Sequence, residues 1–310
     1  MKPWGMGVIG AGIMGRRMIA GVQPHPHWQV AALWDPDAAA AQAAASAAPG
    51  ASVAEGLQAL VRDPAVDLVY VASPPAFHHA GVAAAVAARK PVLCEKPLAH
   101  TVDEAQALRD LVVASGLPFA VHFPFGRSPA ATRLLELVRS GALGEIQRAT
   151  IRAHFARWPR DWQAGAAPWL AGSAQGGFTR EVLSHFVFLS LRLFGPATAE
   201  RVAIERAPGQ AETRLRARLH HAAVTVEIDA AVQGEIADDN AFELVGRQDR
   251  AALRRWAHLE HGGHTSDRID ALPLTLDALA ALVEGRTDTG LASVDEGLAV
   301  VRIIEALLAP

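Results

Sequence analysis

Several features are scarce in this sequence of 310 residues, and each scarcity excludes a type of structure or a class of partner. A single cysteine, Cys94, excludes an intramolecular disulfide. The formal net charge of −3, with no run of like charges, provides no electrostatic pattern for nucleic acid or an anionic membrane. Neither a long apolar run nor a signal-peptide pattern is found. We therefore expect a cytoplasmic protein with a small-molecule partner and with no nucleic-acid or membrane partner.

Tyrosine and lysine are also rare. Tyr70 is the only tyrosine, and Pro74 stands four positions later, which excludes the Tyr-x-x-x-Lys site of short-chain dehydrogenases. Only three of the 29 basic residues are lysines. One of them is Lys96, and a lysine amine can lose its proton or act as a compact donor, which arginine cannot do. Because Lys2 and Lys90 are lysines as well, composition alone only hints at a chemical role for Lys96.

The first 122 residues are predicted to form a doubly wound parallel sheet. Short apolar runs alternate there with helix-length segments, as in buried parallel strands joined by helices. The alanine-rich segment 38–48 fits a crossover helix, and capping boxes predict helices that begin after Thr101 and Ser293. The apolar runs lie at residues 5–10, 28–34, 66–73, 90–94 and 117–121.

Residues 123–310 are predicted to form a second α/β domain. Helices are expected over 129–141 and 178–194, with a loop rich in tryptophan and glycine over 157–172. The strands come one after another, which favours mostly antiparallel pairing. They are expected over 146–155 and near 199–206, 213–219, 223–232 and 241–246.

The clearest chemical motif is a G-x-G-x-x-G sequence that follows the first strand and opens a helix. Glycines there permit a tight turn, close approach of the backbone to a pyrophosphate, and close packing of the helix on its strand. Asp35 lies twenty positions after the last glycine, where a carboxylate can bind a ribose 2′-hydroxyl. A glycine turn beside a capping aspartate is the alternative, but it does not explain the strand-helix-strand context. The residues expected to bind the dinucleotide are Gly10, Gly12, Ile13, Met14, Gly15 and Asp35.

NAD is favoured over NADP as the cofactor. Asp35 is followed by Pro36 and Asp37, with no arginine or lysine nearby to meet a 2′-phosphate. NADP remains the alternative.

Two further segments leave the carboxyl edge of the predicted sheet, where ligands bind in such folds. The first holds Ser73, Pro74 and His78, and the second holds Glu95 and Lys96. We expect these residues to contribute to the cofactor site. For His78, an ordinary histidine at a helix start is an equal alternative.

Glu181 and His185 in the second domain are four positions apart, so a helix places them on one face. An imidazole can take the hydroxyl proton of an alcohol as hydride leaves its carbon. Arg180 adjoins the pair. A surface helix pair or a buried, satisfied histidine is the alternative.

The loop 157–172 contains Trp162 and Trp169, whose indole faces can stack on a sugar or on a cation. Core packing or a subunit contact is the alternative. His258, His261 and His264 are spaced three apart, and imidazoles can bind transition metals. The glycines between them and the absence of cysteine favour a solvated loop, so we predict no metal site.

Together these segments resemble the glucose-fructose oxidoreductase, inositol dehydrogenase and MocA (Gfo/Idh/MocA) family, in the family's order across nearly the whole chain. The resemblance implies an N-terminal Rossmann domain and a C-terminal α/β domain with an open, mostly antiparallel sheet that serves substrate binding and oligomerisation. It is carried by the glycine fingerprint, SPPAFHHA, VLCEKPLA, LLELVRSGALGEI, GGFTREVLSHF and SVDEGLAVVRIIEALL.

The resemblance also implies an activity. Family members oxidise or reduce a carbinol or carbonyl of sugars and cyclitols with NAD(P), and many are homodimers or homotetramers. By position, Lys96 matches the motif lysine that contacts substrate and nicotinamide, and His185 matches the catalytic histidine. Glu181 stands where the family usually has aspartate, and Phe188 stands where it often has a second one. These departures, with the extra cation of Arg180, favour a substrate other than a simple neutral sugar, such as one that carries a carboxylate.

We predict an NAD(P)-dependent dehydrogenase or reductase that acts on CH–OH groups. In it Lys96 polarises the reacting oxygen, His185 accepts the proton and Glu181 orients the substrate or the imidazole. Arg180, Trp162 and Trp169 are expected to contact the substrate. Two alternatives stay open, namely a redox-neutral NAD-dependent glycoside hydrolase and a non-catalytic dinucleotide-binding sensor.

Overall fold

The computed structural model describes residues 2–233 and 235–309, which divide into two compact units. The first unit runs to Phe123 and takes in a later segment, Leu272–Leu298. The second comprises Pro124–Ala271 and the chain from Ala299 onward. The expected division into residues 1–122 and 123–310 did not anticipate that the later segment packs with the first unit. The assignment of cofactor binding to residues 1–122, and of substrate binding and oligomerisation to residues 123–310, remains a proposal.

Sheet A of the first unit has six parallel strands in the order β3-β2-β1-β4-β5-β6. The strand order reverses between β1 and β4, so the carboxyl ends of these two strands mark the topological switch point where such sheets bind ligands. The predicted doubly wound sheet is confirmed, and the short edge strand β3 is an addition to it. The strands are β1 (Trp4–Ile9), β2 (Trp28–Trp34), β3 (Ser52–Val53), β4 (Leu68–Val71), β5 (Val92–Glu95) and β6 (Phe119–His122).

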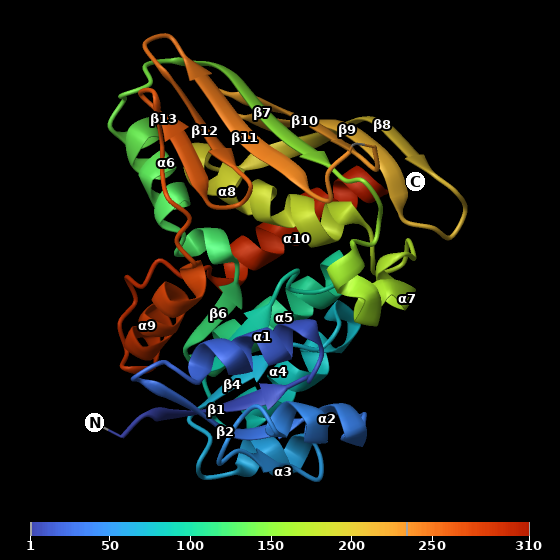
Figure 1. The fold of residues 1–310 in the computed structure, drawn as a ribbon, viewed down its shortest axis with the longest axis vertical. Helices are drawn as coiled ribbons and strands as arrows, with labels where there is room; N and C mark the ends of the chain where they lie inside the picture. Colours follow the sequence, from blue (N-terminus) through green and yellow to red (C-terminus); the bar gives the residue numbers. More distant parts are fainter. Residues whose placement is uncertain (1, 234, 310) are drawn as a thin grey trace. The chain divides into compact units, whose positions relative to one another are not determined.

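Helices connect these parallel strands and cover them (Figure 1). The two expected helix starts are confirmed, because Thr101 Oγ1 accepts from the Glu104 N–H and Ser293 Oγ accepts from the Glu296 N–H, each at 3.2 Å. At Ser293 the reciprocal bond of a capping box is present as well, since the Ser293 N–H donates to Glu296 Oε2 at 2.8 Å. The boundary between the units falls within the last helix. The connecting helices are α1 (Ile13–Val22), α2 (Ala38–Ala45), α3 (Leu57–Arg62), α4 (His78–Ala87) and α5 (Val102–Ser115). Two further helices, α9 (Ala271–Val283) and α10 (Val294–Leu308), follow sheet B in the chain.

Helix α9 belongs to the hydrophobic core of the first unit, although it lies far along the chain. The indole N–H of Trp28 donates to the Leu276 carbonyl at 2.8 Å. Leu272, Leu276 and Leu279 are buried in the same cluster as Val8. Full burial of one leucine side chain is worth about 1.5–3 kcal/mol. The later segment therefore supports the sheet that presents the cofactor motif.

Sheet B of the second unit has the order β14-β13-β12-β11-β7-β10-β9-β8, and every pair except β10 with β7 is antiparallel. This confirms the expected, mostly antiparallel sheet. Helices α6 (Pro129–Arg139) and α8 (Ser184–Phe194) lie along the same face of it (Figure 1). The strands are β7 (Ile146–His154), β8 (Ala197–Arg206), β9 (Glu212–His221), β10 (Thr225–Ala231), β11 (Asp239–Gly246), β12 (Arg250–Arg254), β13 (His258–His261) and β14 (His264–Thr265).

Two predicted loops are more regular than expected. Residues 258–265 form a hairpin of β13 and β14, because Gly262 and Gly263 take positive φ angles of 58° and 77° and reverse the chain. The segment 157–172 contains a 3-10 turn, Asp161–Ala166, and helix α7 (Ala167–Leu170). The loop prediction was wrong at both places, since short turns of this kind leave no periodic pattern. In residues 2–233 and 235–309, none of the helices combines the length and apolar character of a membrane span.

Candidate functional site

The three glycines of the fingerprint have three different geometric reasons to be glycine. Gly10 has a φ of +100°, and a Cβ there would lie 2.8 Å from the Ala72 carbonyl carbon. A Cβ on Gly15 would lie 1.9 Å from the Gly10 carbonyl oxygen, so α1 packs directly on the turn. A Cβ on Gly12 would meet no protein atom within 4 Å. The turn is thus tight where the helix packs and open where a pyrophosphate would approach.

The N-terminus of α1 adjoins this open side. Gly12 is its N-cap and provides no side-chain hydrogen bond to the first N–H groups, which suits an anionic ligand. Asp35, at the end of β2, accepts the Ala11 N–H through Oδ2 at 2.7 Å and the Asp37 N–H through Oδ1 at 2.9 Å. These bonds fix the carboxylate beside the glycine turn and leave acceptor capacity for ribose hydroxyls. Ile13 and Met14 lie half-buried in the first helical turn.

Ser73 and His78 order the segment that follows β4. The hydroxyl of Ser73 is buried and has no protein hydrogen-bond partner, as expected for a group that meets a ligand. His78 is fully buried, with Nε2 2.9 Å from the Ser73 carbonyl oxygen and Nδ1 3.2 Å from that of Leu98. Burial lowers the pKa of His78 and outweighs the raising effect of these carbonyls. His78 thus links the segments after β4 and β5, and the geometry favours support of the cofactor site over direct contact. Pro74 lies between them and caps the following turn.

Glu95 and Lys96 end β5 in a buried polar group. The Glu95 carboxylate accepts hydrogen bonds from the Tyr70 hydroxyl at 2.5 Å and from His122 Nδ1 at 2.7 Å through Oε1, and from the Lys96 N–H at 3.2 Å through Oε2. Burial raises the pKa of Glu95, but the nearby His122, the charge of Lys96 and the Tyr70 hydrogen bond together lower it to about 2. Lys96, which is 9% exposed, follows this carboxylate directly in the chain, and the carboxylate is ionised at neutral pH.

Glu181 and His185 come from two connected helical turns. The expected helix over 178–194 is a π-helical turn, Thr179–Leu183, followed by α8. The turn begins over β9, where Glu212 Oε1 accepts the Thr179 N–H at 2.6 Å. A Cβ on Gly177, whose φ is +95°, would lie 2.3 Å from Glu212 Oε2. Burial raises the pKa of Glu212. Tertiary contacts therefore set the start of this turn, which the sequence pattern could not reveal.

His185 is 8% exposed, and its ring packs among aromatic side chains of its own unit. It lies edge-on to Trp256, with ring centroids 5.2 Å apart and an interplanar angle of 86°. Phe125 lies edge-on to it as well, at 6.1 Å. These contacts restrict the orientation of the imidazole, as a proton-transfer group requires.

Arg180 is held by several partners within the second unit. Its guanidinium binds the Glu305 carboxylate in a forked pair, with Nε–Oε1 and Nη2–Oε2 distances of 2.7 Å. Nη1 donates to the carbonyls of Ser173 and Gly176 at 2.8 and 3.1 Å. This geometry favours a structural role for Arg180, so substrate contact by it stays an untested prediction. Phe188 is fully buried, which makes it a core residue of α8.

Trp162 and Trp169 lie in the helical turns between β7 and the π-helical turn. Trp162 is 54% exposed, and its ring lies under the guanidinium of Arg160 at 4.7 Å. Trp169 is half-buried. Substrate contact by either remains a prediction.

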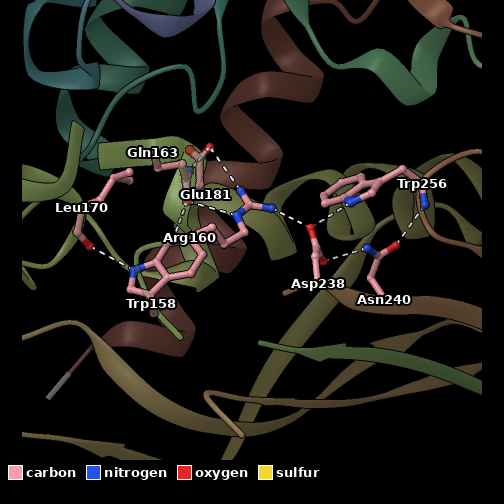
Figure 2. Close-up of polar contacts among 8 residues, drawn as sticks. All are labelled: Trp158, Arg160, Gln163, Leu170, Glu181, Asp238, Asn240 and Trp256. Carbon is pink, nitrogen blue, oxygen red and sulfur yellow. Dashed lines mark hydrogen bonds and ion pairs between the residues drawn. The ribbon is translucent and has the colours of Figure 1, made fainter. Parts of the chain in front are cut away.

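The second unit also contains a polar cluster that the sequence did not indicate, defined by Arg160, Gln163, Glu181, Asp238, Asn240 and Trp256 (Figure 2). Gln163 Nε2 donates to Glu181 Oε1 at 3.3 Å. Asp238 accepts from Arg160, Asn240 and the Trp256 indole at 2.7, 2.8 and 3.0 Å. Within the cluster Glu181 contacts Gln163 and Arg160, and Arg160 links it through Asp238 to Asn240 and Trp256. Sequence reasoning missed it because only Glu181 lay in a recognisable motif.

Family comparison agrees with the geometry of the first unit. Residues 4–123 match the model of the Gfo/Idh/MocA oxidoreductase family, described as an NAD-binding Rossmann fold. The first unit is therefore similar to the NAD-binding domain of this family. Its cofactor is NAD, and the glycine turn, the Asp35 carboxylate and the unpartnered Ser73 hydroxyl fit that group.

Relatives of known name match part of the chain. Inositol 2-dehydrogenase of Corynebacterium glutamicum (strain R) is 37% identical over 145 residues, which is 46% of this chain and 42% of that enzyme. A dTDP-3,4-didehydro-2,6-dideoxy-alpha-D-glucose 3-reductase of Streptomyces violaceoruber is 35% identical over 156 residues, or 50% of this chain and 45% of that one. These matches span less than half the length of each relative.

A solved structure extends the likeness to the second unit. Levoglucosan dehydrogenase, crystallised with NADH and L-sorbose, superposes with a TM-score of 0.83 over 99% of this chain and 96% of that chain. The sequences are 19% identical, so this likeness shows the fold.

Proposed function

We propose that the protein is an NAD-dependent dehydrogenase or reductase that acts on a carbinol or carbonyl of a sugar, cyclitol or related hydroxy compound. The observation that carries the proposal is the glycine turn beside Asp35, which has the geometry of a dinucleotide site and lies within the family match. The inositol and deoxysugar enzymes that resemble the chain support the substrate class. The proposed cellular location is the cytoplasm, as the single cysteine favours.

The dinucleotide is proposed to bind through the fingerprint and through the segments after β4 and β5. When bound, the nicotinamide supplies the hydride acceptor or donor. Lys96 is proposed to polarise the reacting oxygen, and its backbone N–H donates to the ionised Glu95 carboxylate at 3.2 Å. The residues proposed to hold the cofactor are Gly10, Gly12, Ile13, Met14, Gly15, Asp35, Ser73, Pro74, His78, Glu95 and Lys96.

The proton is proposed to move through the second unit. His185 takes the hydroxyl proton during oxidation and returns it during reduction. Glu181 orients the substrate or the imidazole, with its carboxylate held by Gln163. Preorganised groups of this kind stabilise charge that develops as hydride moves.

We also propose a homodimer or homotetramer formed through the face of sheet B that α6 and α8 leave uncovered. Over the first six residues of β8 half-buried and exposed positions alternate, as on a strand with one solvent face. Light scattering of the purified protein tests this, and a monomer at micromolar concentration would contradict it.

The decisive experiment measures NADH formation from NAD with a panel of polyols, aldoses, sugar acids and other hydroxy acids. Lys96→Ala and His185→Asn are each expected to lower kcat by about 10²–10⁴-fold on the substrate found, the usual range for acid–base groups. Lys2→Ala is the matched control, because Lys2 is exposed, and its kcat should equal that of the unchanged protein.

Three other outcomes would contradict the assigned roles or favour one of the alternative functions. If Lys96→Ala and His185→Asn both stay within a few-fold of the unchanged protein, the assigned roles are wrong. Release of an aglycone from a glycoside without net NADH would identify the redox-neutral hydrolase. Tight NADH binding with no turnover of any substrate or glycoside would favour the sensor.

A further inference from the structure

We propose that Arg160 is a positioning residue for Glu181 and His185, an inference that rests on the proposed function of these two. Arg160 lies between β7 and α7, and its side chain is only 5% exposed. Its guanidinium faces groups that lead to both candidate catalytic residues (Figure 2). Arg160 lies outside the sequence motif that contains them both.

One route leads from Arg160 to Glu181. Arg160 Nη2 lies 3.9 Å from Glu181 Oε1. Gln163 reinforces this pair, because its Oε1 accepts from Arg160 Nε at 3.0 Å while its Nε2 donates to the same Glu181 oxygen at 3.3 Å. Gln163 is itself 2% exposed. The Glu181 carboxylate is therefore held by a cation and by an amide that the same cation orients.

A second route leads from Arg160 to His185. Arg160 Nη1 donates to Asp238 Oδ2 at 2.7 Å, and the Trp256 indole N–H donates to the same oxygen at 3.0 Å. The Trp256 ring in turn lies edge-on to His185 at 5.2 Å. Asp238 thus couples the position of the guanidinium to the ring that packs on the imidazole.

The backbone at Trp256 also indicates that this ring is held in place. Trp256 has a φ of +71°, a conformation that residues other than glycine seldom adopt. Its N–H donates to Asn240 Oδ1 at 3.0 Å, and Asn240 Nδ2 donates to Asp238 at 2.8 Å. Backbone strain of this type persists where surrounding contacts impose it, often at functional sites.

Arginine suits this position better than lysine. A planar guanidinium can donate to Gln163 and Asp238 at once and can stack on aromatic rings. The rings of Trp162 and Trp158 lie 4.7 and 5.5 Å from its central carbon. A lysine ammonium has neither the fork nor the flat face, so Arg160→Lys should keep the charge and lose the positioning.

Steady-state kinetics of the intact protein test the proposal. Arg160→Gln is expected to lower kcat about a hundredfold, the effect of misplacing a catalytic group by about 1 Å, and Arg160→Lys is expected to recover little of it. The KM for NAD should stay unchanged, because the cofactor residues belong to the other unit. Arg157→Gln is the matched control, since Arg157 is 71% exposed in the same segment and pairs with Asp161.

A double-mutant comparison separates positioning from simple support of the fold. If Arg160 acts through Glu181, then Arg160→Gln should lower kcat by a smaller factor in a Glu181→Gln background than in the unchanged protein. An equal factor in both backgrounds would overturn the proposal. So would full recovery of kcat in Arg160→Lys.

A readout that needs no turnover keeps this inference apart from the proposed function. The ring-proton NMR signals of His185, assigned with His185→Asn, depend on the nearby Trp256 ring. They are expected to shift in Arg160→Gln and Asp238→Asn and to stay in place in Arg157→Gln. Unshifted signals in folded Arg160→Gln protein would overturn the positioning role, even if the dehydrogenase activity is found. Shifted signals without any turnover would support the positioning and contradict the proposed activity.

Discussion

Glu95 is a buried carboxylate whose charge is stabilised by its neighbours. It is 4% exposed, and burial alone would raise its pKa. The hydrogen bonds from His122 and Tyr70, with the charges of His122 and Lys96, reverse that effect and bring the pKa to about 2. Burial and the Glu95 charge raise the pKa of Tyr70, which therefore stays a hydroxyl donor. The only tyrosine of the chain thus serves to hold the residue that adjoins Lys96.

The depressed pKa of Glu95 predicts a loss of stability in acid. Because the folded-state pKa lies below its ordinary value of 4.5, the ionised carboxylate contributes stability that is fully present above about pH 4.5. That stability is lost as pH falls toward 2, and the shift corresponds to about 3 kcal/mol. Urea unfolding followed by circular dichroism between pH 5 and pH 3 should show a steeper loss in the unchanged protein than in Glu95→Gln. Glu136→Gln, on the exposed face of α6, is the control and should keep the steep loss. Equal slopes in the unchanged protein and Glu95→Gln would contradict this account.

At the scale of single elements, the β1–α1 turn has one glycine that is needed for packing and another that leaves space for a ligand. Gly15 is constrained by the protein itself, whereas Gly12 faces open space. A side chain at Gly15 therefore strains the fold, and one at Gly12 interferes only when a ligand approaches the turn.

Two alanine substitutions test this distinction. Gly12→Ala is expected to keep the melting temperature and to raise the Kd for NADH by about tenfold or more, a loss of about 1.4 kcal/mol. Gly15→Ala is expected to lower the melting temperature as well, because its Cβ would lie 1.9 Å from the Gly10 oxygen. Fluorescence titration with NADH and NADPH, paired with thermal unfolding, measures both effects. If Gly12→Ala protein binds NADH as tightly as the unchanged protein, the pyrophosphate does not bind at this turn.

At the scale of the whole molecule, the first unit is not continuous in sequence, because most of the second unit lies between its two segments. The first unit is completed by Leu272–Leu298, after the chain has formed sheet B. Leu276 of α9 is fully buried in that unit and accepts the Trp28 hydrogen bond through its carbonyl. The unit that carries the cofactor motif thus depends on residues about 150 positions beyond its first segment.

A substitution in α9 should therefore weaken the NAD-binding unit. Leu276→Ala is expected to lower the free energy of unfolding by about 2–5 kcal/mol, the usual cost of a core cavity. Hydrogen exchange should show the loss in β1 and β2, which contribute to the same hydrophobic cluster. Leu274→Ala, at a half-exposed position of the same helix, is the control and should have a smaller effect. Unchanged protection of β1 and β2 in Leu276→Ala would show that α9 does not support the sheet.

The sequence by itself determined the features that depend on local pattern. Apolar runs between helical segments indicated sheet A, because each strand-helix-strand unit is encoded within about thirty consecutive residues. The glycine spacing with Asp35 indicated the dinucleotide turn, because it lies within one such unit. Thr101 and Ser293 marked helix starts for the same reason, since a capping box spans four residues. The candidate roles of Lys96 and His185 came from family resemblance and await the kinetic tests.

Only the tertiary structure decided which distant groups meet. Three contacts join residues that are far apart in the chain. Arg160 pairs with Asp238, Glu212 accepts the Thr179 N–H at the start of the π-helical turn, and α9 packs in the first unit. No local pattern encodes such partners, because any buried charge or apolar face can be satisfied by many different residues. The path of the folded chain selects among them, and it turned Arg180 toward Glu305 and Arg160 toward Glu181.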